Sequence, residues 1–183
     1  GCTARSSSKL ESVQRAGELV VLTRNSPMTY YEGPDGYTGI EYELATAFAQ
    51  HLGVKLRMQV PPRFSDVIPM IARGEGDVAA AGITITDMRR QRVRFAPPYQ
   101  ETRQQVVYRQ GGPYPTSMRE LPGYQLEVSG GTSYEERLHQ LKLVRKKIGD
   151  ARPAIVGAVK GAEQLGRRHV KLGPFSEGLM AVL

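Results

Sequence analysis

One short segment, residues 81–89, combines hydroxyl, guanidinium and backbone groups that can hold an anion. Its sequence is Ala-Gly-Ile-Thr-Ile-Thr-Asp-Met-Arg, and the proline-rich stretch 93–99 follows it. The pattern predicts a turn from a strand into a helix. An oxyanion bound there would meet the Thr84 and Thr86 hydroxyls, N–H groups at the helix start and the fork of Arg89. This combination suits a carboxylate on a small ligand and favours a binding cleft over a catalytic centre.

Two predicted strands precede this turn, and a third leads directly into it. Apolar runs and strict alternation indicate strands at residues 19–22, 54–60 and 77–81. Residues 25–37 are rich in Ser-Pro, Gly-Pro and Asp-Gly pairs, which is typical of loops and turns. Alternation of strands with helices predicts an α/β fold with a parallel sheet covered on both faces. Ligands bind such sheets at the carboxyl ends of strands, where residues 84–89 fall.

Two helices are predicted between these strands. Apolar residues at helical spacing mark the first helix, namely Ile40, Leu44, Phe48 and Leu52. Glu41 and Glu43 near its start satisfy the helix dipole rather than form a catalytic pair, and Gly53 ends it. The second helix spans residues 64–73, where Pro69 requires a late start or a kink.

The pattern begins again after residue 99. A strand at 104–108 and a short helical turn at 117–121 are followed by a strand at 126–128. The segment Ser-Gly-Gly-Thr-Ser, residues 129–133, then leads into a helix that begins near Tyr134. This is a second turn with hydroxyls and N–H groups for an anion. Two such turns predict two lobes that face each other across a cleft.

Composition limits the class of protein and its partners. The chain has 183 residues and a formal net charge of +7. Its basic residues are scattered apart from clusters at 89–92, 145–147 and 167–169, and no nucleic-acid motif accompanies them. We therefore expect solvated surface charge and no nucleic-acid partner. No run of about 18 apolar residues exists, so no segment is expected to span a bilayer.

We expect no catalytic residue, metal or cofactor in this chain. The sequence has no nucleophile–base arrangement, phosphate loop or zinc pattern. His51, His139 and His169 lack carboxylates or cysteines at the spacing of metal ligands, which favours surface positions.

The candidate residues of the first turn also have plainer interpretations. Arg89 can be a surface member of the basic cluster 89–92, and Thr84 can be an ordinary strand residue. Thr86 is expected mainly to cap the helix. We favour Arg89 and Thr84 as ligand contacts.

The single cysteine, Cys2, excludes an internal disulfide. A polar, Ser-rich stretch follows it, which resembles the end of a bacterial lipoprotein signal, where the cysteine is acylated. The alternative is an incidental cysteine. Acylation would make a lipid anchor the chain's only contact with a membrane.

Several segments together resemble a known family, the periplasmic solute-binding proteins for polar amino acids. The matching segments are residues 39–44, 66–71 with Gly74 and Asp77, 81–89, 95–99, 131–133 and 174–182. A closer likeness is to the N-terminal domain of the membrane-bound lytic murein transglycosylase F family, in residues 22–31, the helix from Glu41, 51–56 and 105–108. In that family a solute-binding-like module that senses wall peptides precedes a peptidoglycan-cleaving domain.

The resemblance implies roles for residues at both turns. Gly82 and Thr84 would contact the ligand, and Arg89 would clamp its carboxylate with two prongs. Gly131, Thr132 and Ser133 would bind the same carboxylate from the second lobe. Tyr30 or Tyr31 would cover the apolar part of the ligand, or simply pack.

Three departures from the family pattern bear on the ligand. Arg24 stands where amino-acid binders place an acid for the ligand's ammonium, and Gly157 or Ala158 replaces the second such acid. Arg24 would instead favour an acidic or doubly anionic ligand, or a peptide. The stretch 141–153 is short, so either lobe two is abridged or a piece is missing. The chain also stops at the second crossover, so the resemblance implies that the C-terminal helices of the type II periplasmic-binding-protein fold are absent.

These observations predict a polar tether at residues 1–17, lobe one at 18–100 and lobe two at 101–183. We expect a periplasmic binding module that closes on a small carboxylate ligand, an amino acid or a wall peptide, by a hinge near residues 97–101. It would serve an ABC transporter, or it would be the regulatory part of a lytic transglycosylase with its cleaving domain outside this chain. A third interpretation is a degenerate module that acts only in protein contact.

Overall fold

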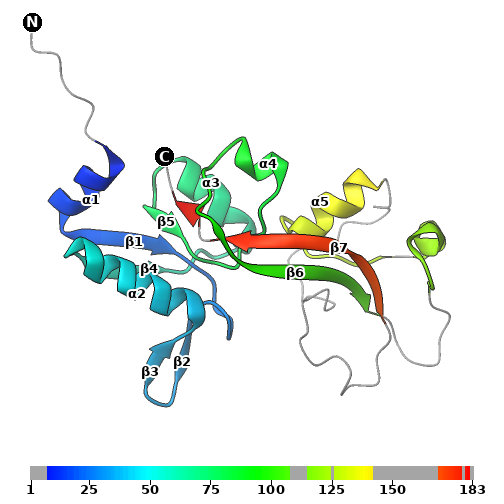
Figure 1. Ribbon diagram of the computed structural model, residues 1–183, viewed down its shortest axis with the longest axis horizontal. Coiled ribbons are helices and arrows are strands. Elements are labelled where there is room, and N and C mark those ends of the chain that lie inside the picture. The colour runs from blue at the N-terminus through cyan, green and yellow to red at the C-terminus, as the bar shows by residue number, and fades with distance from the viewer. Residues whose placement is uncertain (1–7, 108–114, 125, 142–168, 179, 182–183) are drawn as a thin grey trace, which may run out of the picture. The chain divides into compact units, whose positions relative to one another are not determined.

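The computed structural model describes residues 8–107, 115–124, 126–141, 169–178 and 180–181 (Figure 1). Two compact units divide the chain, one made of Gly1–Tyr99 with Glu177–Leu183 and the other of Gln100–Ser176. The sequence-based bounds differ from this division because they place all residues after 100 in lobe two. The segment from Glu177 onward joins the first unit since β8 (Met180–Ala181) pairs with its sheet.

A four-stranded sheet forms the centre of the first unit. Its order is β4 (Lys55–Gln59), β1 (Glu18–Leu22), β5 (Val78–Ala79) and β8 (Met180–Ala181). β1 runs parallel to both β4 and β5, whereas β8 is antiparallel to β5. The three strands predicted in this part of the sequence are confirmed, and so is the parallel arrangement.

Apolar side chains cover both faces of this sheet, as expected for an α/β fold. One core cluster includes Val13 of α1 (Lys9–Ala16), Ala45 and Ala49 of α2 (Ile40–Leu52), and Leu19, Val21 and Val78 of the sheet. The other includes Val67 and Ile71 of α3 (Val67–Ala72), with Leu22, Ala79, Ala81 and Ile83. Because successive residues of a strand point to opposite faces, Val78 and Ala79 belong to different clusters.

Helix α2 (Ile40–Leu52) has the predicted bounds, but small residues face the sheet. Ala45 and Ala49 are buried there, together with Glu41. Between 39% and 45% of the surface of Ile40, Leu44 and Phe48 is exposed. The helical spacing of these large residues therefore located the helix without marking its buried side.

Helix α1 (Lys9–Ala16) lies within the segment that we expected to be a tether. The Ser8 side chain accepts a hydrogen bond from the Glu11 N–H, and the Glu11 carboxylate accepts one from the Ser8 N–H. This capping box begins the helix, and Val13 buries its side chain in the core. The tether expectation therefore does not hold for residues 9–16.

The segment expected to be loop contains a small hairpin. β2 (Tyr31–Gly33) pairs antiparallel with β3 (Gly36–Thr38) across the Pro-Asp turn. Farther along, η1 (Phe64–Asp66) precedes α3 (Val67–Ala72), so the regular α-helix starts late, as Pro69 requires.

The described part of the second unit contains fewer elements. β6 (Pro98–Val107) pairs with β7 (His169–Gly178), and η2 (Met118–Gly123) and α5 (Ser133–Gln140) lie between them in sequence. The predicted strand at 104–108 and helix near Tyr134 are confirmed as far as they are described. The strand predicted at 126–128 is wrong, because the backbone there pairs with no named strand.

Candidate functional site

Three parallel strands of the first unit end at the same edge of the sheet, and the candidate residues Arg24 and Gly82 follow two of them. Leu22 of β1 is in register with Gln59 of β4 and with Ala79 of β5. Because these strands are parallel, their carboxyl ends coincide, and the residues that follow lie close together. Those residues include Arg24 after β1, Phe64 after β4 and Gly82 after β5.

The turn after β5 has the predicted strand-to-helix form. It leads into α4 (Asp87–Arg90), where the Thr86 side chain accepts a hydrogen bond from the Arg89 N–H at 3.3 Å. Thr86 is therefore the helix cap, as expected. Gly82 has a φ of 62°, a conformation that glycine adopts without strain.

The Arg89 guanidinium is held against this turn. Arg89 is buried with 5% of its surface exposed, and its Nη1 donates a hydrogen bond to the Thr84 carbonyl at 3.0 Å. Thr84 is itself buried. The guanidinium therefore lies inside the first unit beside the turn and does not extend into solvent as a member of the surface cluster would.

Glu41, which the sequence analysis assigned only to the helix dipole, is a residue of this site. It is completely buried, and its Oε2 accepts a hydrogen bond from the Gly82 N–H at 2.8 Å. Its Oε1 accepts another from the Tyr99 hydroxyl at 2.7 Å. Its position one helical turn before Ala45 is the one signal that could have placed it on the inner face of α2.

Arg24 lies at the same edge but keeps its side chain exposed. Its guanidinium carbon is 4.9 Å from the centre of the Phe64 ring, a cation–π contact. The Arg24 carbonyl accepts a hydrogen bond from the Thr29 hydroxyl, which fixes the backbone there.

The two tyrosines proposed as ligand cover have different surroundings. The Tyr30 ring stacks on Tyr37 at 4.7 Å between ring centres and lies 5.5 Å from Tyr42 at a tilt. Burial, followed by a hydrogen bond with Tyr37, raises the pKa of the Tyr30 phenol above its ordinary value. Tyr31 is 39% exposed in β2. Tyr30 thus packs within an aromatic cluster, whereas Tyr31 is open to solvent.

The second predicted turn begins α5 in the second unit. The Thr132 side chain accepts a hydrogen bond from the Glu135 N–H at 3.3 Å and donates one to the Ser129 carbonyl at 2.7 Å. The Glu135 carboxylate accepts the Gly131 N–H at 2.8 Å. The Ser133 hydroxyl lies 3.2 Å from Nε2 of Gln104. A ligand carboxylate at this turn would compete with Glu135 for the Gly131 N–H.

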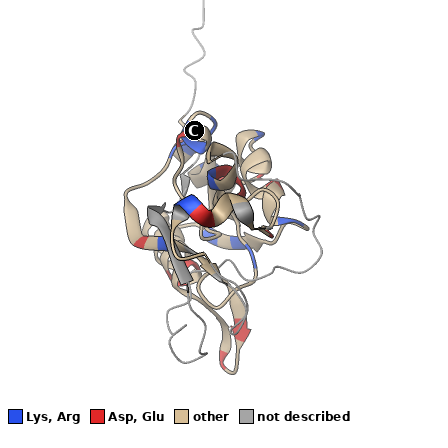
Figure 2. Cartoon of the chain, turned by 90° about the vertical axis from the view of Figure 1, so that its right-hand side faces the viewer, with Lys and Arg blue, Asp and Glu red and all other residues tan. Residues whose placement is uncertain are grey.

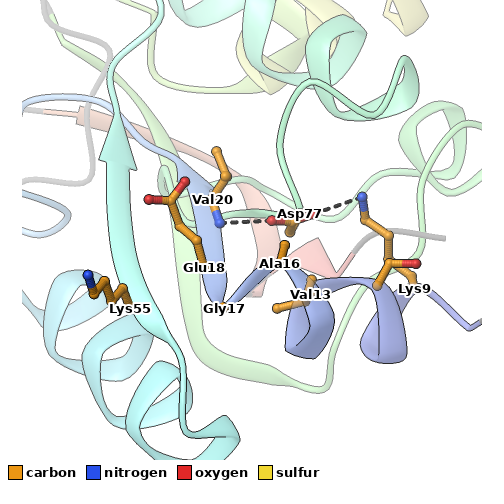
Figure 3. Close-up of a pocket in the computed structure, with 9 residues that line it drawn as sticks. Lys9, Val13, Ala16, Gly17, Glu18, Val20, Lys55 and Asp77 are labelled. Carbon is orange, nitrogen blue, oxygen red and sulfur yellow. Dashed lines mark hydrogen bonds and ion pairs between the residues drawn. The ribbon is translucent and has the colours of Figure 1, made fainter.

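A cavity of about 720 Å³ lies at the opposite edge of the first sheet (Figure 3). It is lined by α1 and by the amino ends of β1 and β4, with Asp77 just before β5. Asp77 forms an ion pair with Lys9 at 2.8 Å and accepts the Val20 N–H at 2.8 Å. These bonds join α1 to the sheet, so Lys9 and Asp77 have structural roles in this cavity.

Other features bear on the expected partners. Within the described ranges, no helix is long and apolar enough to cross a membrane. No group of three or more possible metal-binding side chains occurs in that same part of the chain. Figure 2 shows basic and acidic residues interspersed along the described elements. Cys2, the short stretch 142–153 and the positions of Gly157 and Ala158 lie outside the described residues.

Solved structures define the class of protein to which this fold belongs. The arginine-bound form of truncated ArgBP from T. maritima matches with a TM-score of 0.76 at 22% identity, over 94% of this chain and 91% of that one. An ancestral amino acid-binding protein, AncCDT-1, matches with a TM-score of 0.74 at 24% identity, over 96% and 86% of the two chains. The chain therefore has the α/β fold of the periplasmic amino-acid-binding proteins.

Residues 19–169 match the family of bacterial extracellular solute-binding proteins, family 3, and the chain belongs to this family. Among curated relatives, the membrane-bound lytic murein transglycosylase F of Saccharophagus degradans is 40% identical over 140 residues, which are 76% of this chain. Membrane-bound lytic murein transglycosylase F 1 of Alkalilimnicola ehrlichii is 46% identical over 133 residues, or 73% of this chain. The matched regions are only 28% and 27% of those relatives.

Proposed function

We propose that this chain is a periplasmic solute-binding module that captures a small carboxylate ligand, either an amino acid or a peptide derived from peptidoglycan. The observation that carries the proposal is the buried guanidinium of Arg89, held on the Thr84 carbonyl at the carboxyl edge of the sheet. A guanidinium is a planar fork of N–H donors, and this geometry matches the two oxygens of a carboxylate.

The groups around Arg89 support this role. Glu41 holds the backbone of Gly82 in place, and the Thr86 cap fixes the start of α4. Binding to donors that are already fixed in place costs less entropy than binding that must first order mobile side chains. In this proposal Tyr31 covers the ligand, and Gly131, Thr132 and Ser133 bind it from the second unit when Glu135 releases the Gly131 N–H.

Calorimetric titration with a panel of amino acids and muropeptides tests the proposal. Arg89→Met should abolish binding, and Arg89→Lys should weaken it at least about tenfold because an ammonium lacks the two-pronged geometry. Arg90→Met is the matched control, because Arg90 is the exposed neighbour on the same helix. Unchanged affinity in a folded Arg89→Met variant would contradict the proposal.

A second candidate function is ligand sensing within a peptidoglycan lytic transglycosylase. The curated relatives at 40% and 46% identity favour it, because they carry that name and are much longer than the matched region. The genetic context discriminates between the two, namely the coding sequence that follows Leu183 and the genes beside it. A helical domain with a Glu-Ser pair would support regulation of lytic activity, whereas a neighbouring ABC transporter operon would support transport.

Two further parts of the proposal need separate tests. Acylation of Cys2 would anchor the module to the outer membrane, and mass spectrometry of the exported protein, compared with the Cys2→Ser variant, would detect it.

A degenerate module that binds only protein would show no thermal shift with any amino acid or muropeptide. A shift is expected from any true ligand, because a ligand that binds only the native state raises the melting temperature.

A further inference from the structure

We propose that Arg24 is a second carboxylate-binding residue, so that the first unit selects ligands with two carboxylates over ligands of the same size with one. This inference rests on the proposed function, because it assumes that Arg89 holds the first carboxylate. It narrows the ligand class to acidic amino acids and peptides with an acidic side chain.

Two contacts hold Arg24 in place although its side chain is exposed. Thr29, itself buried, donates its hydroxyl to the Arg24 carbonyl and fixes the backbone. The guanidinium then lies over the Phe64 ring, which packs against the core of the first unit. An arginine held by an aromatic face loses less freedom on binding an anion than a freely rotating one.

The Arg24 guanidinium lies against Gly82, in the turn that leads to Arg89. A Cβ atom at Gly82 would be 3.1 Å from Nη2 of Arg24, so the guanidinium lies directly against the glycine backbone. Arg89 contacts the carbonyl of Thr84, two residues farther along. The Cα atoms of Gly82 and Thr84 are at most roughly 7 Å apart, so both guanidinium groups lie beside the same short turn.

The charges around Arg24 leave its cation available. Within the described residues, Arg24 takes part in no ion pair, and the acids near it have other partners. Glu41 accepts the Gly82 N–H and the Tyr99 hydroxyl. Asp66, which follows Phe64 by two residues, is bound by Arg63 through two hydrogen bonds. Two guanidinium groups beside one short turn repel each other, and a dianion relieves that repulsion.

Pairs of ligands that differ only in charge provide the test. We would titrate the full chain with L-glutamate and L-glutamine, and with the dipeptides Ala–Glu and Ala–Gln, by calorimetry at low and high salt. We expect the acid of a pair to bind at least about tenfold more tightly than the amide at low salt, with a smaller ratio at high salt.

Three variants test whether Arg24 causes the preference for the acid over the amide. Arg24→Met should remove the preference and leave amide affinity within about threefold, because the lost contact is to the second carboxylate. Arg24→Lys should retain part of it, since the charge remains without the fork. Arg90→Met is the matched control: Arg90 is also exposed and lies 6.0 Å from the Phe95 ring, and its loss should change neither affinity.

The outcomes separate the inference from the proposed function. Equal binding of acid and amide by the wild type overturns the inference and leaves carboxylate capture standing. Arg24→Met weakening acid and amide equally also overturns it, because Arg24 would then only support the site. Absence of binding for every member of both pairs overturns the inference and counts against the proposed function as well.

Discussion

The Tyr99 hydroxyl donates a hydrogen bond to Oε1 of Glu41 at 2.7 Å. Tyr99 lies in β6, the strand with which the chain leaves the first unit, and Glu41 lies in the first turn of α2. The other carboxylate oxygen of Glu41 binds the N–H of Gly82 in the candidate anion-binding turn. One buried side chain thus connects the helix, the turn and the departing strand.

Replacing Glu41 should therefore destabilise the first unit. Glu41→Ala leaves the Gly82 N–H without this acceptor and opens a cavity, and we expect a loss of about 3 kcal/mol in the free energy of unfolding. Tyr99→Phe removes one hydrogen bond at a partly exposed residue and should cost about 1 kcal/mol. Urea denaturation measures both, and equal stability of Glu41→Ala and wild type would refute the connecting role.

Gly39→Ala should be among the more damaging single substitutions. A Cβ there would overlap the carbonyl oxygen of Thr29, and φ at this position is 132°. Clash and strain together should cost about 3 kcal/mol or more. Gly36→Ala is the control, because its φ is 113° but no atom lies within 4 Å of the added Cβ. Thermal unfolding should place the Gly36 variant nearer to wild type.

The cap of α5 allows a local test in the second unit. Thr132→Ala removes the oxygen that accepts the Glu135 N–H, which should cost about 1 kcal/mol, while Thr132→Ser keeps that oxygen and should be nearly neutral. Hydrogen exchange of the amides in α5 reports this change directly. Equal protection in the two variants would show that the side chain does not cap the helix.

The ion pair between Arg63 and Asp66 should make stability depend on pH in acid. Hydrogen bonds from Arg63 hold the pKa of the Asp66 carboxyl below its ordinary value of 3.8. Because the folded pKa is the lower one, this contribution is complete above the unfolded value and is lost as pH falls through the folded value. Arg63→Ala should flatten the acid limb of a plot of melting temperature against pH. An identical limb in both proteins would contradict this assignment.

Much of the first unit could be predicted from sequence because local patterns determine it. Alternation at residues 54–60 and an apolar run at 19–22 identified neighbouring parallel strands. Gly53 and Pro69 set the end of one helix and the late start of another. In each case the conformation depends on residues close together in the chain.

The remaining features depend on contacts between distant residues. Glu41 has its role only because Gly82 and Tyr99 come to it, and neither is near it in sequence. The exposed side of α2 likewise depends on the small alanines that allow close approach to the sheet. A periodic pattern cannot tell which side of a helix meets its neighbour when both sides contain apolar residues.

The pairing of β8 with β5 affects the order in which a growing chain can fold. Residues 78–79 leave the ribosome about one hundred positions before their partners at 180–181. During that interval the outer edge of β5 presents unpaired amide and carbonyl groups to any strand nearby. Synthesis of the whole second unit therefore separates the first sheet from its completion, and a nascent chain is most exposed to mispairing along that edge.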